Sequence, residues 1–269
     1  MKQSARPCIF CGRFGLSREH FWPEWMHPLL PPAPDPRHVE RRMTFTEKGK
    51  LVDVPRNVER QGGARTKTIK VVCRQCNGGW MSALEEAVRP VLTPMMAGNE
   101  FALSDTQQAL LARWIALKVI VADANVPQDT VMTREERSAF MTDHQLPAFL
   151  DIWIARTNGV LWSSEFHRHA ATISFDRQHQ PIGAKSIQCM TFGAAQFLAF
   201  AVLDRGRIGI GIEEKSKAKA LQLWPAMSPP LTWPPPRTIT DVEAHSMANT
   251  LDRVIASHQV KWLPRPDRV

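Results

Sequence analysis

The sequence predicts an α+β fold built from two parts. Residues 1–98 carry two widely separated Cys-x-x-Cys pairs joined by alternating, strand-like segments. Residues 99–269 begin with helical periodicity and change to short apolar strands after Gly159. We therefore expect an N-terminal module held together by its cysteines, followed by a mixed helical and antiparallel β domain whose role the sequence leaves unassigned.

The two cysteine pairs are the strongest local signal. Cys8 and Cys11 form the first pair, and Cys73 and Cys76 form the second. Four thiolates from two such turns can surround one tetrahedral zinc ion, so we expect a structural zinc site. The alternative is four unrelated reduced thiols. The fifth cysteine, Cys189, lies in an apolar run and is predicted to be a buried, inert thiol.

Composition and charge limit the functional classes. No apolar stretch approaches the length of a membrane span, and Met1 to Pro7 contains no apolar signal segment, so we expect a soluble cytoplasmic protein with no membrane partner. Residues 1–80 contain 15 Lys and Arg against 7 Asp and Glu, which equals the formal excess of +8 for the whole chain. A basic surface localised in this way attracts nucleic acid, although it could also be a solvated face without a partner.

The N-terminal part is predicted to contain a helix and a hairpin. Glu19 to Leu30 has helix-like apolar spacing and ends at the proline-rich run 31–36. Arg42 to Thr46 and Lys50 to Val54 flank Gly49 as a hairpin, and Thr66 to Val72 leads back to the second cysteine pair. The basic segment Arg56 to Lys67 is expected to be a mobile loop.

Helices are expected in the middle of the chain. One starts after Cys76 and ends near Pro90 or Pro94, and a core helix capped by Ser104 covers Asp105 to Asp123. Two shorter helices are expected, at Thr133 to Met141 and at Pro147 to Arg156.

The remainder of the chain is expected to form strands and a last helix. The predicted strands are Gly159–Ser163, Ala170–Phe175, Ser186–Phe192, Phe197–Leu203 and Ile208–Ile212. The last helix is expected from Thr240 to about His258.

Three polar residues near the cysteines suggest a second, catalytic metal. Glu19 and His20 follow Cys11 closely, and Asn77 comes directly after Cys76. Carboxylate and amide oxygens suit a hard divalent ion such as Mg²⁺, and a neutral imidazole can take a proton from water. Taken without the cysteines, a Glu-His pair beside aromatic residues would more often be an ordinary packed or surface pair.

Together these motifs resemble the HNH (ββα-metal) endonucleases, in particular the four-cysteine, endonuclease VII-like type. The resemblance covers about residues 5–95. It implies that Glu19 and Asn77 bind a catalytic Mg²⁺ or Mn²⁺, that His20 is the general base, and that Cys8, Cys11, Cys73 and Cys76 hold zinc. Glu19 stands where Asp is commoner, and Asn77 where His is more usual. The middle Asn of the motif has no clear counterpart, since Thr68 falls near its place and Asn57 lies further upstream.

The resemblance implies metal-dependent hydrolysis of DNA, with basic side chains contacting the sugar-phosphate backbone. The candidate contacts are Arg56, Arg60, Arg65, Lys67, Lys70 and Arg74. The alternatives are a non-catalytic zinc module that binds nucleic acid or protein, and a phage-defence effector nuclease gated by the C-terminal domain. The sequence leaves the oligomeric state open, with a homodimer as one option. A weaker candidate is His167-Arg168-His169, which would place two imidazoles on one strand face as a metal pair or phosphate site.

Overall fold

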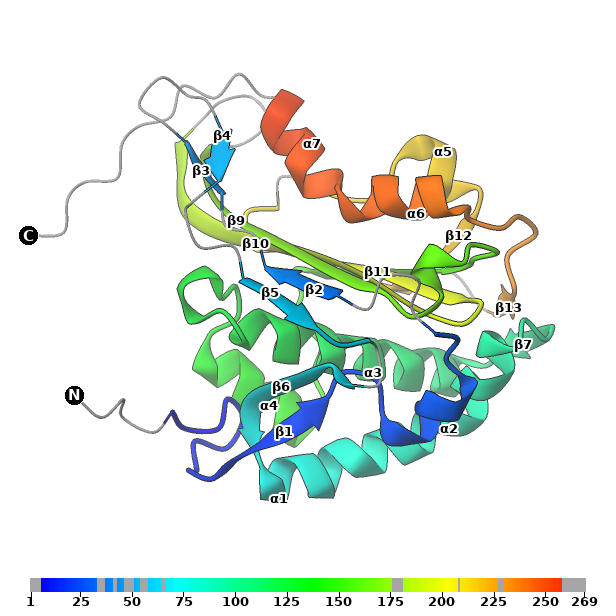
Figure 1. Cartoon of the computed structure of the whole chain (residues 1–269), viewed down its shortest axis with the longest axis horizontal. Coiled ribbons are helices and arrows are strands. Elements are labelled where there is room, and N and C mark those ends of the chain that lie inside the picture. The colour runs from blue at the N-terminus through cyan, green and yellow to red at the C-terminus, as the bar shows by residue number, and fades with distance from the viewer. Residues whose placement is uncertain are drawn as a thin grey trace, which may run out of the picture.

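The structure is a computed structural model of the whole chain. It describes residues 6–32, 37–40, 43–45, 51–53, 58–63, 66–175, 181–207, 209–226 and 230–257. Helices and strands are both present, and among the described residues every pairing between the named strands is antiparallel. An α+β fold is therefore confirmed (Figure 1).

A five-stranded antiparallel sheet forms the middle layer. Its order is β12-β8-β11-β10-β9, with bounds Ala220–Trp224, Leu150–Arg156, Phe197–Asp204, Pro181–Ala194 and Phe166–Phe175. All eight residues of β11 are buried, because this strand lies inside the sheet and both of its faces are covered. Its near-continuous apolar sequence follows from that position.

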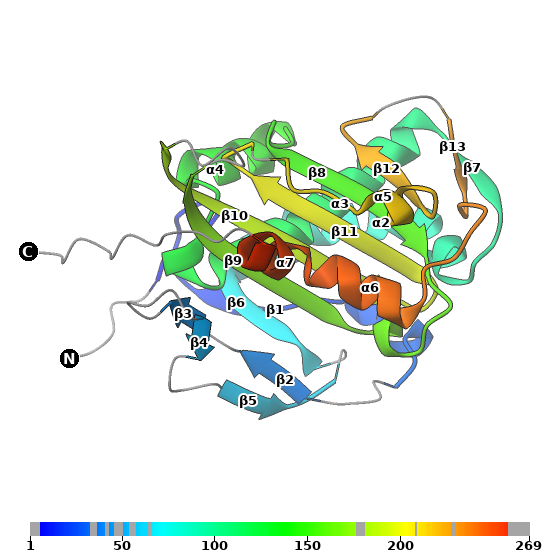
Figure 2. The ribbon, with the colours of Figure 1, turned by 90° about the horizontal axis from the view of Figure 1, so that it is seen from above.

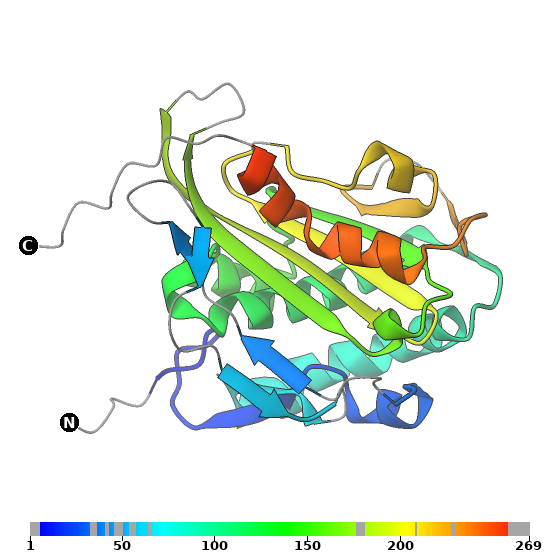
Figure 3. The same cartoon turned by 45° about the horizontal axis from the view of Figure 1, so that its top comes forward.

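Helices cover both faces of the sheet. The 20-residue helix α3 (Asp105–Ala124) packs on one face, and α2 (Ser82–Met96) lies outside it. On the opposite face α6 (Asp241–Ala248) and α7 (Thr250–Ser257) lie across the strands (Figures 2 and 3). Each face has its own cluster of buried apolar residues. Further elements are α4 (Arg134–Asp143), α5 (Glu214–Lys217), η4 (Pro127–Asp129), η5 (Leu161–Ser163), and the paired strands β7 (Phe101–Leu103) and β13 (Leu231–Trp233).

The N-terminal part contains two strands followed by a helix. β1 (Leu16–His20) pairs antiparallel with β6 (Thr68–Cys73). The chain then continues through α1 (Arg74–Cys76) and the π-helical turn η3 (Asn77–Met81) into α2. Between β1 and β6 lie η1 (Glu24–Leu29) and two strand pairs, β2 (Arg37–Glu40) with β5 (Val58–Gln61), and β3 (Met43–Phe45) with β4 (Leu51–Asp53).

Aromatic side chains join the N-terminal part to the sheet. The ring of Phe21 stacks on that of Phe166 in β9, with centroids 4.5 Å apart. The indole N–H of the buried Trp22 donates to the Gly193 carbonyl in β10 at 3.0 Å. The larger hydrophobic cluster contains residues from both sides of the boundary expected at 98/99. That boundary stays a prediction, while the packing across it is continuous.

Several predicted elements are confirmed. Ser104 caps α3 through a capping box with Gln107, α4 covers most of the expected helix at 133–141, and β9, β10 and β11 include three of the expected strands. The hairpin around Gly49 is present as β3 and β4. The thiol of Cys189 is buried as predicted.

The helix expected from Glu19 to Leu30 is wrong. Glu19 and His20 end a strand, and only the short 3-10 helix η1 follows. Pro28 lies inside η1 and lacks the N–H that a longer helix would require, so the apolar spacing is satisfied by an irregular turn instead. The loop expected from Arg56 to Lys67 is also partly wrong, because Val58–Gln61 forms β5.

The helix expected to stop near Pro90 or Pro94 runs through both prolines and ends two residues after the second, at Met96. Val91, Leu92, Met95 and Met96 are all buried. An interior proline costs about 3 kcal/mol or more, whereas each buried apolar side chain contributes about 1.5–3 kcal/mol. The packing of this face therefore keeps the last turns helical.

Further errors follow from reading periodicity in short segments. Pro147–Arg156 was expected to be helical, but Leu150–Arg156 forms β8, because its side chains alternate between more and less buried positions inside the sheet. Gly159–Ser163 was expected to be a strand and contains the 3-10 helix η5. Residues 209–212 form no strand, and Ile208 lies outside the described residues. The expected last helix is two helices, which break at Asn249.

Candidate functional site

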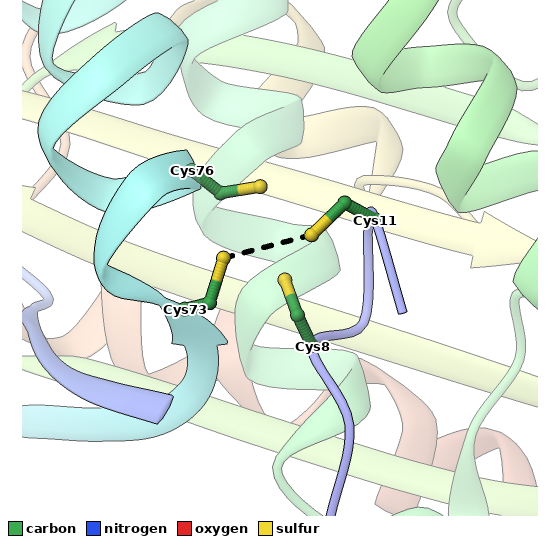
Figure 4. Close-up of side chains that lie close together, drawn as sticks. All are labelled: Cys8, Cys11, Cys73 and Cys76. Carbon is green, nitrogen blue, oxygen red and sulfur yellow. Dashed lines mark hydrogen bonds between the residues drawn. The ribbon is translucent and has the colours of Figure 1, made fainter. Parts of the chain in front are cut away.

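The four predicted zinc ligands come together at one end of the β1–β6 pair (Figure 4). Cys8 and Cys11 lie in a tight turn that is closed by the Gly12 N–H donating to the Cys8 carbonyl at 3.0 Å. Gly12 adopts a φ of 73°, a left-handed conformation that glycine accepts without strain. Cys73 ends β6 and Cys76 ends α1, so a strand and a helical turn present the second pair.

The geometry of these thiols fits a tetrahedral metal. All four sulfur atoms lie within 4.8 Å of one another, and the Sγ atoms of Cys11 and Cys73 are 3.5 Å apart. A tetrahedral zinc with Zn–S bonds of about 2.3 Å would hold its sulfurs roughly 3.8 Å apart. All five cysteines are free thiols, and Cys8, Cys73 and Cys76 are buried. The cluster could therefore hold a zinc ion.

The thiols of the cluster affect one another's pKa values because they lie so close together. Burial raises the pKa of the Cys11 and Cys76 thiols, and hydrogen bonds with neighbouring thiols contribute to both increases. Burial opposes ionisation of Cys73 as well, but the Cys76 backbone N–H and the three other thiols lower its pKa to about 7. A shared zinc ion would stabilise all four thiols as thiolates.

Aromatic packing fixes this end of the molecule against α4. The ring of Phe10, between the first two cysteines, lies 4.9 Å from that of Trp80 in an edge-on arrangement. Phe140 of α4 contacts both, at 6.4 Å from Phe10 and 6.0 Å from Trp80. The cysteine cluster is therefore anchored to the body of the protein as well as to β1 and β6.

Glu19 points into the core and forms a buried ion pair that sequence reasoning missed. Its Oε1 atom accepts from the Lys118 ammonium of α3 at 3.1 Å. The same ammonium lies 2.5 Å from Oε1 of Glu85 in α2 and 3.4 Å from the carbonyl of His20. Lys118 is 1% exposed. It is a cation at a buried position of the apolar core helix, and this position was the one signal in the sequence that could have pointed to a buried partner.

Two carboxylates share this single ammonium. Burial alone would lower the pKa of Lys118, but the adjacent charges of Glu85 and Glu19 raise it above its ordinary value. Burial raises the pKa of Glu85, and the nearby Glu19 charge adds to that effect, against the attraction of Lys118. The attraction between the Lys118 ammonium and the carboxylates of Glu19 and Glu85 therefore stabilises the charged forms of these groups.

This arrangement does not fit Glu19 as a ligand of a divalent ion. Its carboxylate is only 5% exposed and is occupied by the ammonium of Lys118. A divalent ion at Glu19 would have to share this buried carboxylate with that ammonium. The structure therefore shows Glu19 as a counter-ion within the core.

His20 lies next to Glu19 but is partly exposed, as expected for successive residues of a strand. Its side chain is 33% exposed, and Nδ1 lies 3.5 Å from Oε1 of Glu24. The His27 ring stands edge-on to the His20 ring at 5.4 Å, and Nε2 of His27 contacts the Trp22 carbonyl at 3.0 Å. His20 is thus accessible to solvent and close to a second imidazole and a carboxylate.

Asn77 lies beside β1, as the sequence predicted. It is the first residue of η3, and its Nδ2 donates to the Ser17 hydroxyl and to the Arg18 carbonyl, both at 3.3 Å. The Arg18 carbonyl is two residues before His20. The structure therefore brings Asn77 to the strand that carries Glu19 and His20, through contacts with their neighbours.

The predicted nucleic-acid contacts are only partly described. Arg56 and Arg65 lie outside the described residues, and Arg60 is placed only by its backbone in β5. Lys67 lies over the Phe166 ring at 4.9 Å, and Lys70 and Arg74 are exposed at the β6 end.

The His167-Arg168-His169 segment lies in β9. The His167 ring is 6.2 Å from the rings of both His169 and His245, and Nδ1 of His169 lies 3.0 Å from Oδ2 of Asp252. Burial lowers the pKa of His167 to about 4, and the neighbouring imidazoles add to this. In the described part of the chain, only the four cysteines bring three or more such ligand atoms within 4.8 Å of one another.

Two further observations concern the chain as a whole. Among the described residues, no helix combines the length and apolar character needed to cross a membrane. Comparisons with protein families, with curated proteins and with solved structures give no match.

Proposed function

We propose that this chain is an HNH-type endonuclease that hydrolyses DNA phosphodiester bonds and contains a structural zinc. The observation that carries the proposal is the order of strand, strand and helix around the cysteine cluster. β1 and β6 pair, the four cysteines join their ends to α1, and Asn77 then bonds back to β1 beside His20.

His20 is the group proposed to take a proton from the attacking water. A half-exposed imidazole is accessible to both water and substrate. The contact with Glu24 engages Nδ1, so Nε2 is the nitrogen left to accept the proton. A bound Mg²⁺ or Mn²⁺ ion would supply charge stabilisation at the phosphate. Because Glu19 is paired with Lys118, we assign no step through such an ion.

A second function is favoured by one specific observation. The buried network of Glu19, Lys118 and Glu85 gives Glu19 a structural role, as in a zinc module that binds nucleic acid without cleaving it. Under this alternative, His20 is a partly exposed surface histidine and the basic N-terminal part supplies the affinity.

Cleavage assays with matched histidine variants test the proposal. Plasmid and branched DNA are incubated with the zinc-loaded protein under Mg²⁺, Mn²⁺ or EDTA. Loss of a general base reduces the rate by about 10²- to 10⁴-fold, so His20→Ala should lose cleavage. His27→Ala removes the neighbouring imidazole and serves as the control, with its activity retained.

Two outcomes would decide against the nuclease. If folded, zinc-loaded His20→Ala cleaves as fast as the parent, the assigned role of His20 is wrong. If the parent binds DNA under all three conditions but never cleaves it, the non-catalytic alternative is supported instead.

A further inference from the structure

A groove between the N-terminal part and the start of α4 is lined by basic and apolar residues. It has a volume of about 400 Å³. Its floor is apolar and includes Ile9, Leu16, Val71 and Met132. Among the described residues, four cations line it, namely Arg6, Lys70, Arg134 and Arg137, and none of the lining residues is a carboxylate. Residues of β1, β6 and the start of α4 line it together.

We propose that this groove binds the sugar-phosphate backbone of a nucleic-acid strand. The proposal depends on the proposed function for its substrate class, and it adds Arg6, Arg134 and Arg137 to the contacts expected from the sequence. An apolar floor suits the sugar, and cations along the edge suit successive phosphates. The absence of carboxylates from the lining disfavours a basic peptide.

Three of the four cations are available to a ligand. Arg6, Lys70 and Arg134 are exposed, and none of them forms an ion pair with a carboxylate among the residues that the structure describes. Arg137 is half-buried and has a supporting role, because its guanidinium donates to the carbonyls of Ile9 and Met132. It therefore joins the first cysteine turn to the start of α4.

Arg134 packs against the turn that contains Cys8 and Cys11. Its guanidinium lies directly over Gly12, where a Cβ atom would collide with it. The backbone N–H groups at the start of α4 do not provide the site, because the capping box of Thr133 and Glu136 already engages that end of the helix. Binding would therefore depend on the side chains of the groove.

Of the cations that line the groove, Lys70 shares a face of the β1–β6 pair with His20. Lys70 and Thr68 lie two residues apart on β6 and so point to the same face, while Ile69 between them is buried. Thr68 pairs directly with His20, and directly opposed residues of an antiparallel pair share a face. Lys70 and His20 therefore share one face of the β1–β6 pair, about 7 Å apart along the strand. Lys70 therefore stands on the face that carries the proposed base, whereas Leu16 and Val71 of the groove lie on the other face of the pair.

Charge reversal in the groove tests this proposal through binding alone. Fluorescence anisotropy of labelled single- and double-stranded oligonucleotides is measured with zinc-loaded protein and no added Mg²⁺ or Mn²⁺. Lys70→Glu and Arg134→Glu should each weaken binding about tenfold and reduce the slope of log K against log salt by about 1. Arg89→Glu, an equal change on the exposed face of α2, is the matched control and should change binding less than twofold.

Separate controls test whether each variant is folded and whether the groove prefers a nucleic-acid strand to free phosphate. Zinc content and circular dichroism confirm each variant, and Arg134→Gln removes the charge without adding an opposing one. The proposal is overturned if Lys70→Glu and Arg134→Glu bind like Arg89→Glu. It is also overturned if inorganic phosphate or a mononucleotide competes as well as an oligonucleotide at equal phosphate concentration.

The nuclease and the groove can fail independently. If Arg134→Glu weakens binding but the parent cleaves nothing, the groove stands and the nuclease does not. If the parent cleaves DNA and the reversals change neither binding nor KM, the nuclease stands and the groove does not.

Discussion

Lys118→Met removes the single cation that two buried carboxylates share. The ammonium is 1% exposed and lies 3.1 Å from Glu19 and 2.5 Å from Glu85, whose side chains are 5% and 15% exposed. Methionine keeps most of the volume of the side chain but leaves both carboxylates uncompensated. Breaking a buried pair by removing one partner costs about 3–5 kcal/mol, so we expect the free energy of unfolding to fall by that amount at pH 7.5.

The loss should become smaller at low pH. Burial already raises the pKa of Glu85, and removing Lys118 takes away the main attraction that lowers it. A carboxyl group with a raised pKa in the folded state is most stable there when protonated. The destabilisation caused by the charged carboxylate is therefore fully present at a pH above its pKa in the folded protein. It disappears as the pH falls toward the pKa of the unfolded chain, about 4.3.

Urea denaturation at pH 7.5 and pH 5 measures both effects. The double variant Lys118→Met/Glu85→Gln provides the control, because it removes one of the uncompensated charges and should regain part of the lost stability. A loss below about 1 kcal/mol at pH 7.5 would refute the assignment of a buried ionic network, given that such pairs cost several times more to break. An equal loss at both pH values would refute the electrostatic explanation.

Three further predictions concern zinc, pH and the junction between the two parts. Zinc analysis should return about one equivalent per chain, and Cys73→Ser should lose it together with folding energy on the order of 10 kcal/mol, whereas Cys189→Ala should retain it. Lowering the pH from 7.5 to 4 should reduce the free energy of unfolding by up to about 3 kcal/mol, since the pKa of His167 is about 4 in the folded protein and about 6.5 in the unfolded chain. Denaturation at both pH values measures this loss, and His167→Gln should abolish the share that is due to His167. Phe21→Ala should cost about 3–5 kcal/mol while unfolding stays a single transition, because Phe21 packs on Phe166 across the expected boundary at 98/99; two separate calorimetric transitions in the parent would contradict this.

The sequence was informative where spacing alone determines structure. The cysteine pairs predicted the cluster, because each Cys-x-x-Cys forms its own tight turn. Ser104 and the apolar period after it predicted α3 almost to the residue. Both signals are local, so they survive whatever tertiary packing surrounds them.

Long-range packing decided what the sequence could not. Glu19 forms an ion pair with Lys118, which lies 99 residues later in the chain. The sequence around either residue does not indicate that the other is its partner. Leu150–Arg156 has apolar residues that suit a helix or a strand, and it forms β8 because β11 and β12 offer hydrogen bonds on both sides. The same limit explains why Glu19 was assigned to a metal, since its burial depends on the position of α3.

The strand that carries His20 is held at both of its ends by different means. At one end Leu16 pairs with Cys73, so its position depends on the cysteine cluster. At the other end Lys118 bonds to Glu19 and to the carbonyl of His20, so that part of β1 is tied to the core helix. Asn77, by contrast, follows Cys76 directly and reaches β1 only through two weak hydrogen bonds. Loss of zinc should therefore displace Asn77 before it displaces His20. An Asn77→Ala variant that keeps its zinc and its fold but loses all cleavage would place Asn77 in the proposed reaction, and the response of His20→Ala alone could not show this.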